Sequence, residues 1–165
     1  MRILLLFLFC LGLTGSSSLF AQNQVPFVEL KTLDGNAADL KTHLSGAKLT
    51  VISFWATWCK PCQAELDAIA ELYPEWQEQY GAQLIAITID TQRQLAKVGP
   101  MVETKGWPYI ILSDVNNLMR NALNFQAIPQ TYVVDQQGNI LYAHSGYVPG
   151  NEYELEEKLK ALRQR

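Results

Sequence analysis

Residues 53–63 read S-F-W-A-T-W-C-K-P-C-Q and place two cysteines, Cys59 and Cys62, three positions apart. The apolar and β-branched run that leads into this stretch, residues 49–54, predicts a buried strand. From Pro61 onward the large apolar residues recur every three or four positions, which predicts a helix. Cys59 therefore stands where a strand passes into a helix.

The start of a helix favours an ionised sulfur at Cys59. The first N–H groups of a helix lack partners within it and the helix dipole is positive there, so both stabilise a thiolate. Lys60 adds a positive charge, and Pro61 suits the first turn because its missing N–H costs no hydrogen bond there. A thiolate with a second thiol one turn away can carry out thiol–disulfide exchange. We expect Cys59 to be the nucleophile and Cys62 to resolve the mixed disulfide.

The segment W-A-T-W-C-K-P-C, residues 55–62, resembles the active-site segment of the thioredoxin superfamily. The W-C-x-P-C form is far more specific than C-x-x-C alone. The resemblance implies that the cysteine pair cycles between dithiol and disulfide. We expect Trp55 to be a core residue, and Trp58, Lys60 and Pro61 to contact the substrate, with Trp58 offering an apolar docking surface.

Other uses of a C-x-x-C pair remain open. A zinc site usually needs four ligands, and the chain has no second cysteine pair. His144 would be a third ligand in a copper-carrying relative, but such relatives generally separate their cysteines by three residues. A structural disulfide in a binding module and a peroxidase of the same fold are further alternatives, although the peroxidase pattern P-x-x-x-T-x-x-C is absent around Cys59. We predict no metal or organic cofactor.

Composition describes one ordinary globular domain. The chain has 165 residues, of which 48% are hydrophobic and 18% charged. Its net charge is −3, without a basic cluster, so a nucleic-acid partner is not expected. We predict a monomer that acts on other proteins.

Residues 1–21 predict a signal peptide. Arg2 is followed by an uncharged apolar run, residues 3–13, then by small and polar residues 14–18 and by Leu19-Phe20-Ala21, a plausible cleavage zone. Cleavage after Ala21 is expected, and cleavage after Ser18 is an alternative. An uncleaved membrane anchor is the alternative, because the uncharged stretch could just span a bilayer. Cleavage would remove Cys10 and leave one cysteine pair in an oxidising compartment, the periplasm or cell exterior of a bacterium.

The remainder, residues 25–165, predicts one α/β domain in which strands and helices alternate. The predicted strands span residues 25–30, 37–40, 49–54, 84–89, 109–112, 131–135 and 140–144. The predicted helices span residues 61–80 with a break at Pro74, residues 92–105 with a perturbation at Gly99-Pro100, residues 116–123 and residues 151–163. Asp90 and Asp114 are predicted helix caps without a chemical role.

This order predicts a mixed central sheet with helices on both faces. It resembles the thioredoxin-like fold with an N-terminal hairpin and a central insertion, residues 91–112. This decorated form is similar to the TlpA/ResA type of secreted or anchored thiol–disulfide oxidoreductases. The resemblance covers nearly the whole chain after residue 24 and is strongest at residues 54–65 and 128–138.

Two further predictions about the site rest on this resemblance. It implies that Pro129, in Ile128-Pro129-Gln130-Thr131, is a cis proline beside the cysteines and that Ile128 pairs its backbone with an extended substrate. Thioredoxins proper carry an acidic residue where this chain has Ser53. The TlpA/ResA type instead carries a glutamate three residues after the second cysteine, where Glu65 stands, and a solvated helix carboxylate is the alternative reading.

Taken together, the residues and the resemblance predict an exported thiol–disulfide oxidoreductase that reduces particular exported proteins, with a thiol oxidase of the same fold as the alternative. The resemblance suggests roles such as reducing apocytochrome c before haem attachment. Electrons would then come from a membrane partner.

Overall fold

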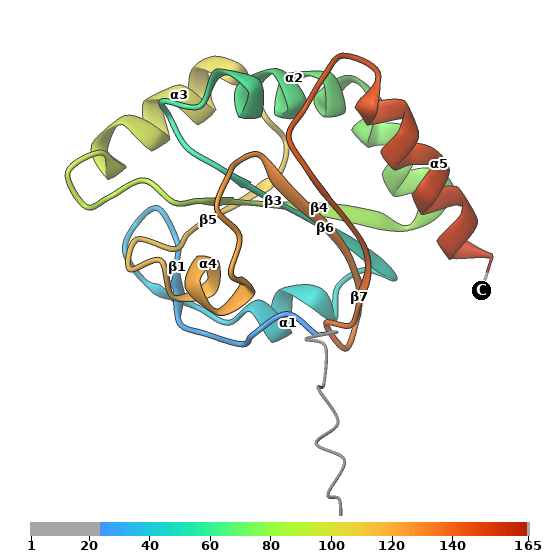
Figure 1. Ribbon diagram of the computed structural model, residues 1–165, viewed down its shortest axis with the longest axis horizontal. Helices are drawn as coiled ribbons and strands as arrows, with labels where there is room; N and C mark the ends of the chain where they lie inside the picture. Colours follow the sequence, from blue (N-terminus) through green and yellow to red (C-terminus); the bar gives the residue numbers. More distant parts are fainter. Residues whose placement is uncertain (1–23, 165) are drawn as a thin grey trace, which may run out of the picture.

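A seven-stranded mixed sheet forms the centre of the protein, with helices on both faces (Figure 1). The computed structural model describes residues 24–164, and the predicted signal peptide lies outside them. In spatial order, the strands are β2 (Ala37–Ala38), β1 (Leu30–Lys31), β5 (Ile110–Ser113), β4 (Ala82–Thr88), β3 (Leu49–Trp55), β6 (Gln130–Asp135) and β7 (Ile140–Ser145). The strands β3, β4 and β5 are parallel, and the remaining pairings are antiparallel.

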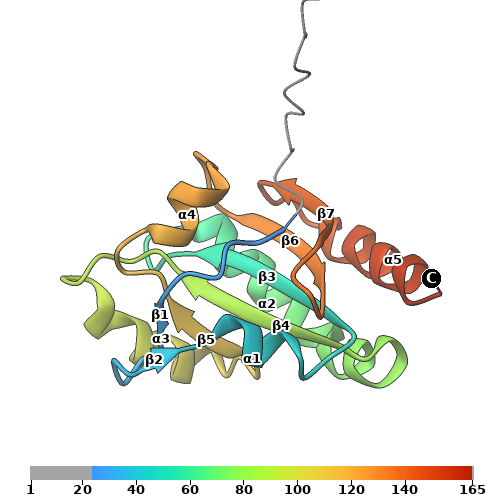
Figure 2. The same cartoon turned by 90° about the horizontal axis from the view of Figure 1, so that it is seen from below.

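The helices form two layers around this sheet. One face carries α2 (Lys60–Glu75), α3 (Val98–Lys105) and α5 (Asn151–Arg163), and the other carries α1 (Leu40–Leu44) and α4 (Leu118–Leu123) (Figures 1 and 2). This arrangement confirms the predicted fold class. Within residues 24–164, no helix is both long enough and apolar enough to cross a membrane.

The central strand β3 anchors the redox loop to the core. All seven of its residues are buried, as expected for a strand covered on both faces. Phe54 packs against Phe125 and Tyr132, and Trp55 packs edge-to-face against Trp107. Aromatic packing therefore holds the end of β3 in place, and the loop that carries the cysteines starts from this end.

The helix after the cysteines differs from the prediction at Pro74. The helix α2 runs through Pro74 to Glu75 and continues as a π-helical segment, Trp76–Tyr80. Proline cannot donate the helical hydrogen bond, and the wider π turn follows it within two residues. The predicted break is thus a change of helix type. Gly81 ends the segment in a left-handed conformation, as predicted.

The predicted strand over residues 25–30 is largely wrong. Only Leu30 and Lys31 form β1, while Gln24 makes an isolated bridge to Asn139. Pro26 removes one of the N–H groups that a strand needs, and Val25 is instead buried in the core. The predicted turn at Asp34-Gly35 and the short return strand β2 are confirmed.

The predicted helix over residues 92–105 is shorter than expected. A turn of 3₁₀ helix, Leu95–Lys97, precedes α3, which begins at Val98. Pro100 lies in the first turn of α3, where its missing N–H costs no internal hydrogen bond. The predicted cap at Asp90 is wrong, because its side chain bonds elsewhere. Asp114 does cap α4, accepting a hydrogen bond from the Arg120 N–H at 2.9 Å.

Candidate active site

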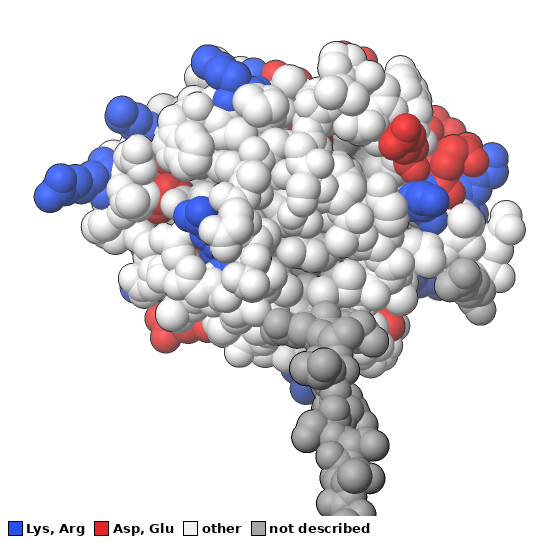
Figure 3. Space-filling model, in the orientation of Figure 1, with Lys and Arg blue, Asp and Glu red and all other residues white. Residues whose placement is uncertain are grey.

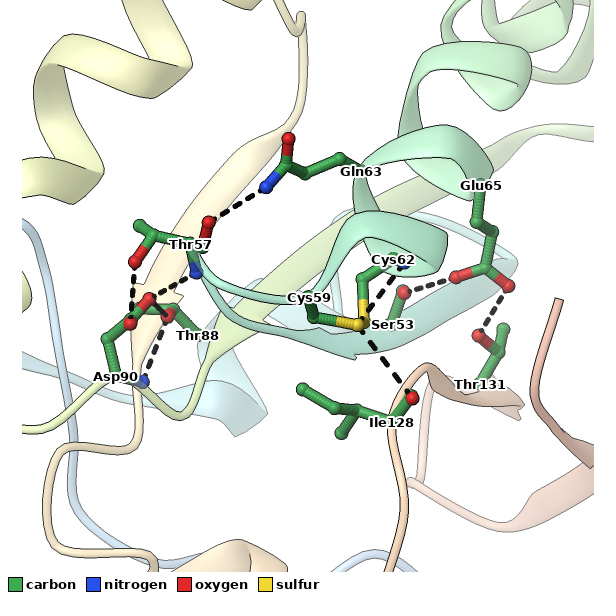
Figure 4. The surroundings of a disulfide bond; sticks show 10 residues. All are labelled: Ser53, Thr57, Cys59, Cys62, Gln63, Glu65, Thr88, Asp90, Ile128 and Thr131. Carbon is green, nitrogen blue, oxygen red and sulfur yellow. Dashed lines mark hydrogen bonds between the residues drawn. A yellow bond between two sulfur atoms is a disulfide. The ribbon is translucent and has the colours of Figure 1, made fainter.

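Cys59 and Cys62 form a disulfide at the N-terminus of α2 (Figure 4). Cys59 is the N-cap residue, and its sulfur accepts a hydrogen bond from the Cys62 N–H at 3.3 Å. A sulfur in this position accepts a hydrogen bond from a helix N–H group that has no partner within the helix. It also lies at the positive end of the helix dipole. The predicted placement of Cys59 at the mouth of the helix is confirmed.

The two sulfur-bearing residues differ in accessibility. Cys59 is 5% exposed, whereas Cys62 is fully buried. Trp58 is 57% exposed beside Cys59, and Lys60 and Pro61 are also exposed. An incoming thiolate or disulfide can therefore reach Cys59 from solvent, while Cys62 can react only with its neighbour.

The loop between β3 and α2 is held by Asp90. One carboxylate oxygen of Asp90 accepts hydrogen bonds from the Thr57 N–H at 2.8 Å and the Thr88 hydroxyl at 2.7 Å, and the other accepts from the Thr57 hydroxyl at 2.8 Å. From α2, the side-chain amide of Gln63 donates to the Thr57 carbonyl at 2.8 Å (Figure 4). These bonds fix the loop that carries Cys59.

The peptide bond between Ile128 and Pro129 is cis, as predicted. The Ile128 carbonyl oxygen lies 3.8 Å from the sulfur of Cys59 (Figure 4). The Pro129 carbonyl accepts a hydrogen bond from the Gly146 N–H at 2.8 Å, whereas the Ile128 N–H makes no backbone hydrogen bond within residues 24–164. The backbone of Ile128 therefore offers an unpaired donor next to the disulfide.

Glu65 is a buried carboxylate, only 1% exposed, and the alternative of a solvated helix residue is excluded. It accepts hydrogen bonds from the hydroxyl of Ser53 at 2.9 Å and from that of Thr131 at 3.0 Å. Figure 4 shows the carboxylate turned toward these two hydroxyls, with the Ser53 hydroxyl drawn between it and the disulfide. Ser53 cannot act as a base, but its hydroxyl donates a hydrogen bond that orients the Glu65 carboxylate.

Three polar residues form a row beneath Glu65. Ser53 on β3 pairs with Thr131 on β6, and Thr131 pairs with His144 on β7. Residues directly opposite each other in paired strands project from the same face of a sheet. The Nε2 atom of His144 lies 3.3 Å from a Glu65 oxygen. His144, considered above only as a ligand in a copper-carrying relative, therefore lies against Glu65. No group of metal-binding side chains occurs within residues 24–164.

The molecular face seen in Figure 1 carries few charges at its centre. Figure 3 shows acidic and basic side chains mostly at its edges, with the middle of the face nearly uncharged. The most exposed large apolar side chains within the described part of the chain are Val148, Tyr153 and Trp58, at 62%, 59% and 57%. Such a surface suits a protein partner better than a nucleic acid.

Comparison with known proteins places this site in a family. The model of the AhpC/TSA family matches residues 21–143. The chain belongs to the AhpC/TSA family. Its relatives include thiol-disulfide oxidoreductase ResA of Geobacillus kaustophilus, which is 28% identical over 166 residues, 98% of this chain and 92% of the relative. Thioredoxin-like protein YneN of Bacillus subtilis is 30% identical over 136 residues, 82% and 76% of the two chains.

A solved structure extends the AhpC/TSA family assignment to the fold. The solution structure of an uncharacterized thioredoxin-like protein from Porphyromonas gingivalis is 40% identical, covers 86% of this chain and 93% of its own, and superposes with a TM-score of 0.75. The predicted resemblance to ResA-type proteins of the thioredoxin superfamily is confirmed. With the Cys59–Cys62 disulfide, these likenesses identify a thiol–disulfide oxidoreductase.

Sequence reasoning missed two parts of this family member's site. Asp90 and Gln63 position the redox loop, and the only sequence signal was the place of Asp90 directly after a buried strand. His144 was considered solely as a metal ligand. His144 and Tyr142 lie two positions apart on β7 and alternate with exposed residues, which indicates that both project from the inward face. Which residue His144 meets on that face depends on strand register.

Proposed function

We propose that this ResA-like oxidoreductase reduces disulfides in specific exported proteins, with Cys59 as nucleophile and Cys62 as resolving cysteine. The observation that carries the proposal is the asymmetry of the pair: the Cys59 sulfur sits at the helix mouth and is reachable, while Cys62 is fully buried behind it. Reduced apocytochrome c before haem attachment is one product that such a reductase could supply.

The reaction proceeds in two exchanges. The Cys59 thiolate attacks one sulfur of the substrate disulfide, forms a mixed disulfide and releases the other substrate sulfur as a thiolate. The Cys62 thiolate then attacks the Cys59 sulfur, closes the intramolecular disulfide and releases the second substrate thiolate. Two electrons pass from the cysteine pair to the substrate, whose thiolates take protons from water.

Glu65 is proposed to accept the proton that Cys62 must lose. Glu65 follows Cys62 by three positions on α2, so both side chains lie on one face of the helix, and both are buried from water. Because bulk solvent cannot remove the proton directly, an internal base is needed, and Glu65 is the carboxylate on that face. If Glu65→Gln left the pH dependence of exchange unchanged, this role would be excluded.

The substrate is proposed to lie as an extended segment across the disulfide. The free Ile128 N–H can pair with its backbone, and the exposed ring of Trp58 can contact its side chains, with Lys60 and Pro61 at the border. The Ile128 carbonyl oxygen, 3.8 Å from the Cys59 sulfur, supports this placement, because it brings the Ile128 backbone beside the disulfide.

The compartment and the partners follow from the same chemistry. We propose export through the signal of residues 1–21, action as a monomer in the periplasm or at the cell exterior, and rereduction by a membrane electron donor. In an oxidising compartment a reductase cannot recover its dithiol without such a donor.

Trapping tests the proposed function. Cys62→Ser should retain the attacking thiolate and lose the resolving thiol, so exported proteins should accumulate on it as adducts that a reductant releases. Cys59→Ser is the matched control and should trap nothing. Full turnover by Cys62→Ser without any adduct would refute the assignment.

The reduction potential separates the alternatives. A purely structural disulfide in a binding module should resist the glutathione pool, with a potential below about −300 mV. A cycling pair should equilibrate with glutathione at a higher potential. Hydrogen peroxide consumption, measured in the same preparation, would instead indicate a peroxidase.

A further inference from the structure

His144 carries a partly buried imidazole, 18% exposed, that the proposed exchange does not yet use. Its Nε2 atom lies 3.3 Å from a Glu65 oxygen, yet neither ring nitrogen is in hydrogen-bond geometry with another atom of the described residues, and both are shielded from solvent. A buried polar group without a partner carries a cost unless it gains a hydrogen bond in another state of the protein. A proton placed between His144 and Glu65 supplies that bond.

We propose that His144 and Glu65 bind one proton as a pair, and that this pair takes up the proton of Cys62. His144 acts through Glu65, so it is a positioning residue rather than a catalytic one. The inference rests on the proposed function and deepens it. In this step the S–H bond of Cys62 breaks and the proton binds the pair. The electron pair left on the sulfur forms the new bond to Cys59, while the bond between Cys59 and the substrate sulfur breaks and the substrate leaves as a thiolate. The pair later loses the proton to water.

The imidazole makes the pair a better proton acceptor than a lone carboxylate. When the pair holds a proton, the charges can be arranged as imidazolium and carboxylate, which attract each other in a site of low dielectric. When the pair loses it, the carboxylate remains bonded to the hydroxyls of Ser53 and Thr131. Both states are therefore supported by groups already in place.

Other titratable and charged groups also surround the pair. They come from α2, β7, the loop after β7, and α5: Cys62, Tyr142, Tyr147, Glu152 and Lys158. Burial, the hydrogen bond that it donates to Glu152, and the nearby carboxylates of Glu152 and Glu65 raise the pKa of Tyr147 to about 12. Burial also raises the pKa of Tyr142. The Lys158 side-chain nitrogen lies 5.6 Å from the centroid of the Tyr142 ring.

The two histidines of the chain make the coupling measurable. His144 faces Glu65, whereas His43 lies in α1 on the opposite face of the sheet. NMR titration of both imidazoles in wild type and in Glu65→Gln reads the interaction without any substrate. We expect the midpoint of the His144 titration to move to lower pH in Glu65→Gln, because the substitution removes an adjacent opposite charge. The His43 midpoint should not move.

Kinetics supply a second readout. The pH profile of single-turnover exchange with a model disulfide should show an inflection from the pair in wild type. His144→Asn should lose that inflection and slow the exchange ~10-fold, while His43→Asn should match wild type. An unchanged His144 midpoint in Glu65→Gln, or an unchanged pH profile in His144→Asn, overturns the proposal.

The two readouts keep this inference separate from the proposed function. The titration is read on wild-type His144 and remains informative even if His144→Asn does not fold. If the protein exchanged no disulfide at all, the proposed function would fail while the titration could still show the coupled pair. If exchange were normal and the midpoint did not move, only the role of His144 would fail.

Discussion

Asp90 illustrates how a single buried residue positions the redox loop. It is fully buried and accepts three hydrogen bonds, two of them from Thr57, two residues before Cys59. Its place after β4 looked like a helix cap, because acidic residues at the ends of strands commonly begin helices. The partner that it actually binds lies 33 residues earlier in the chain, a distance that no local pattern spans.

Asp90→Ala should destabilise the protein by about 2–4 kcal/mol, because the Thr57 N–H and the Thr88 hydroxyl would be left buried without partners. Urea unfolding measures the change. Asp34→Ala, at an exposed turn, is the control and should change the free energy of unfolding by less than about 0.5 kcal/mol. Equal effects of the two substitutions would contradict the role given to Asp90.

Asp114 introduces a pH dependence of stability. Burial raises the pKa of this carboxyl above its ordinary value, against the opposing effect of hydrogen bonds from the start of α4. The folded protein therefore binds more protons than the unfolded chain between the ordinary and the raised value, and stability falls as pH rises through that window. Asp114→Asn should remove this contribution. Urea unfolding from about pH 4 to about 6 checks it, and an identical slope in the variant and wild type would contradict it.

Among the elements, those with strong local patterns were predicted well. The strands β3, β4 and β6 and the helix α5 agree with the sequence because burial on two faces or an apolar stripe leaves an unmistakable spacing. The errors occur where contacts with distant parts of the chain determine the local structure. Residues 25–30 have the alternation of a strand, but Val25 packs into the core and its N–H bonds to Gly138.

The turn between β6 and β7 is held by a glycine that cannot be replaced without strain. Gly138 has φ of +83°, and a Cβ there would lie 3.0 Å from Phe27 and 3.1 Å from Val25. Gly35 has the same φ with nothing nearby, so it isolates the backbone effect. We expect Gly35→Ala to cost about 1 kcal/mol and Gly138→Ala about 1–3 kcal/mol more. Thermal unfolding compares the two; equal losses would show that the crowding is relieved without cost.

In the molecule as a whole, the sheet brings together what the sequence keeps apart. The cysteine pair was predictable because its chemistry is local: a strand, a proline and a helix start within eleven residues, 53–63. The contact between Glu65 and His144 was not, since it requires the register that aligns β3, β6 and β7 side by side. The burial of Glu65 likewise depends on the packing of α2 onto these strands.

Export determines whether the cysteine pair can work as proposed. We predict that the exported protein lacks residues 1–21, because the short apolar run is followed by small and polar residues 14–18 and then by Ala21, a suitable last residue before a cleavage site. The intact mass of the protein recovered from the cell envelope measures this. A full-length protein in the membrane fraction would instead indicate an uncleaved anchor.

The central claim is that Cys59 is held ionised at the mouth of α2. The most direct measurement is the alkylation rate of reduced, mature Cys62→Ser protein by iodoacetamide from about pH 5 to about 9, with the same protein unfolded in urea as control. We predict that the folded protein reaches half of its maximal rate well below pH 8.5, about where a free cysteine does, and that unfolding restores the ordinary profile. Identical profiles for the folded and unfolded protein would contradict the account.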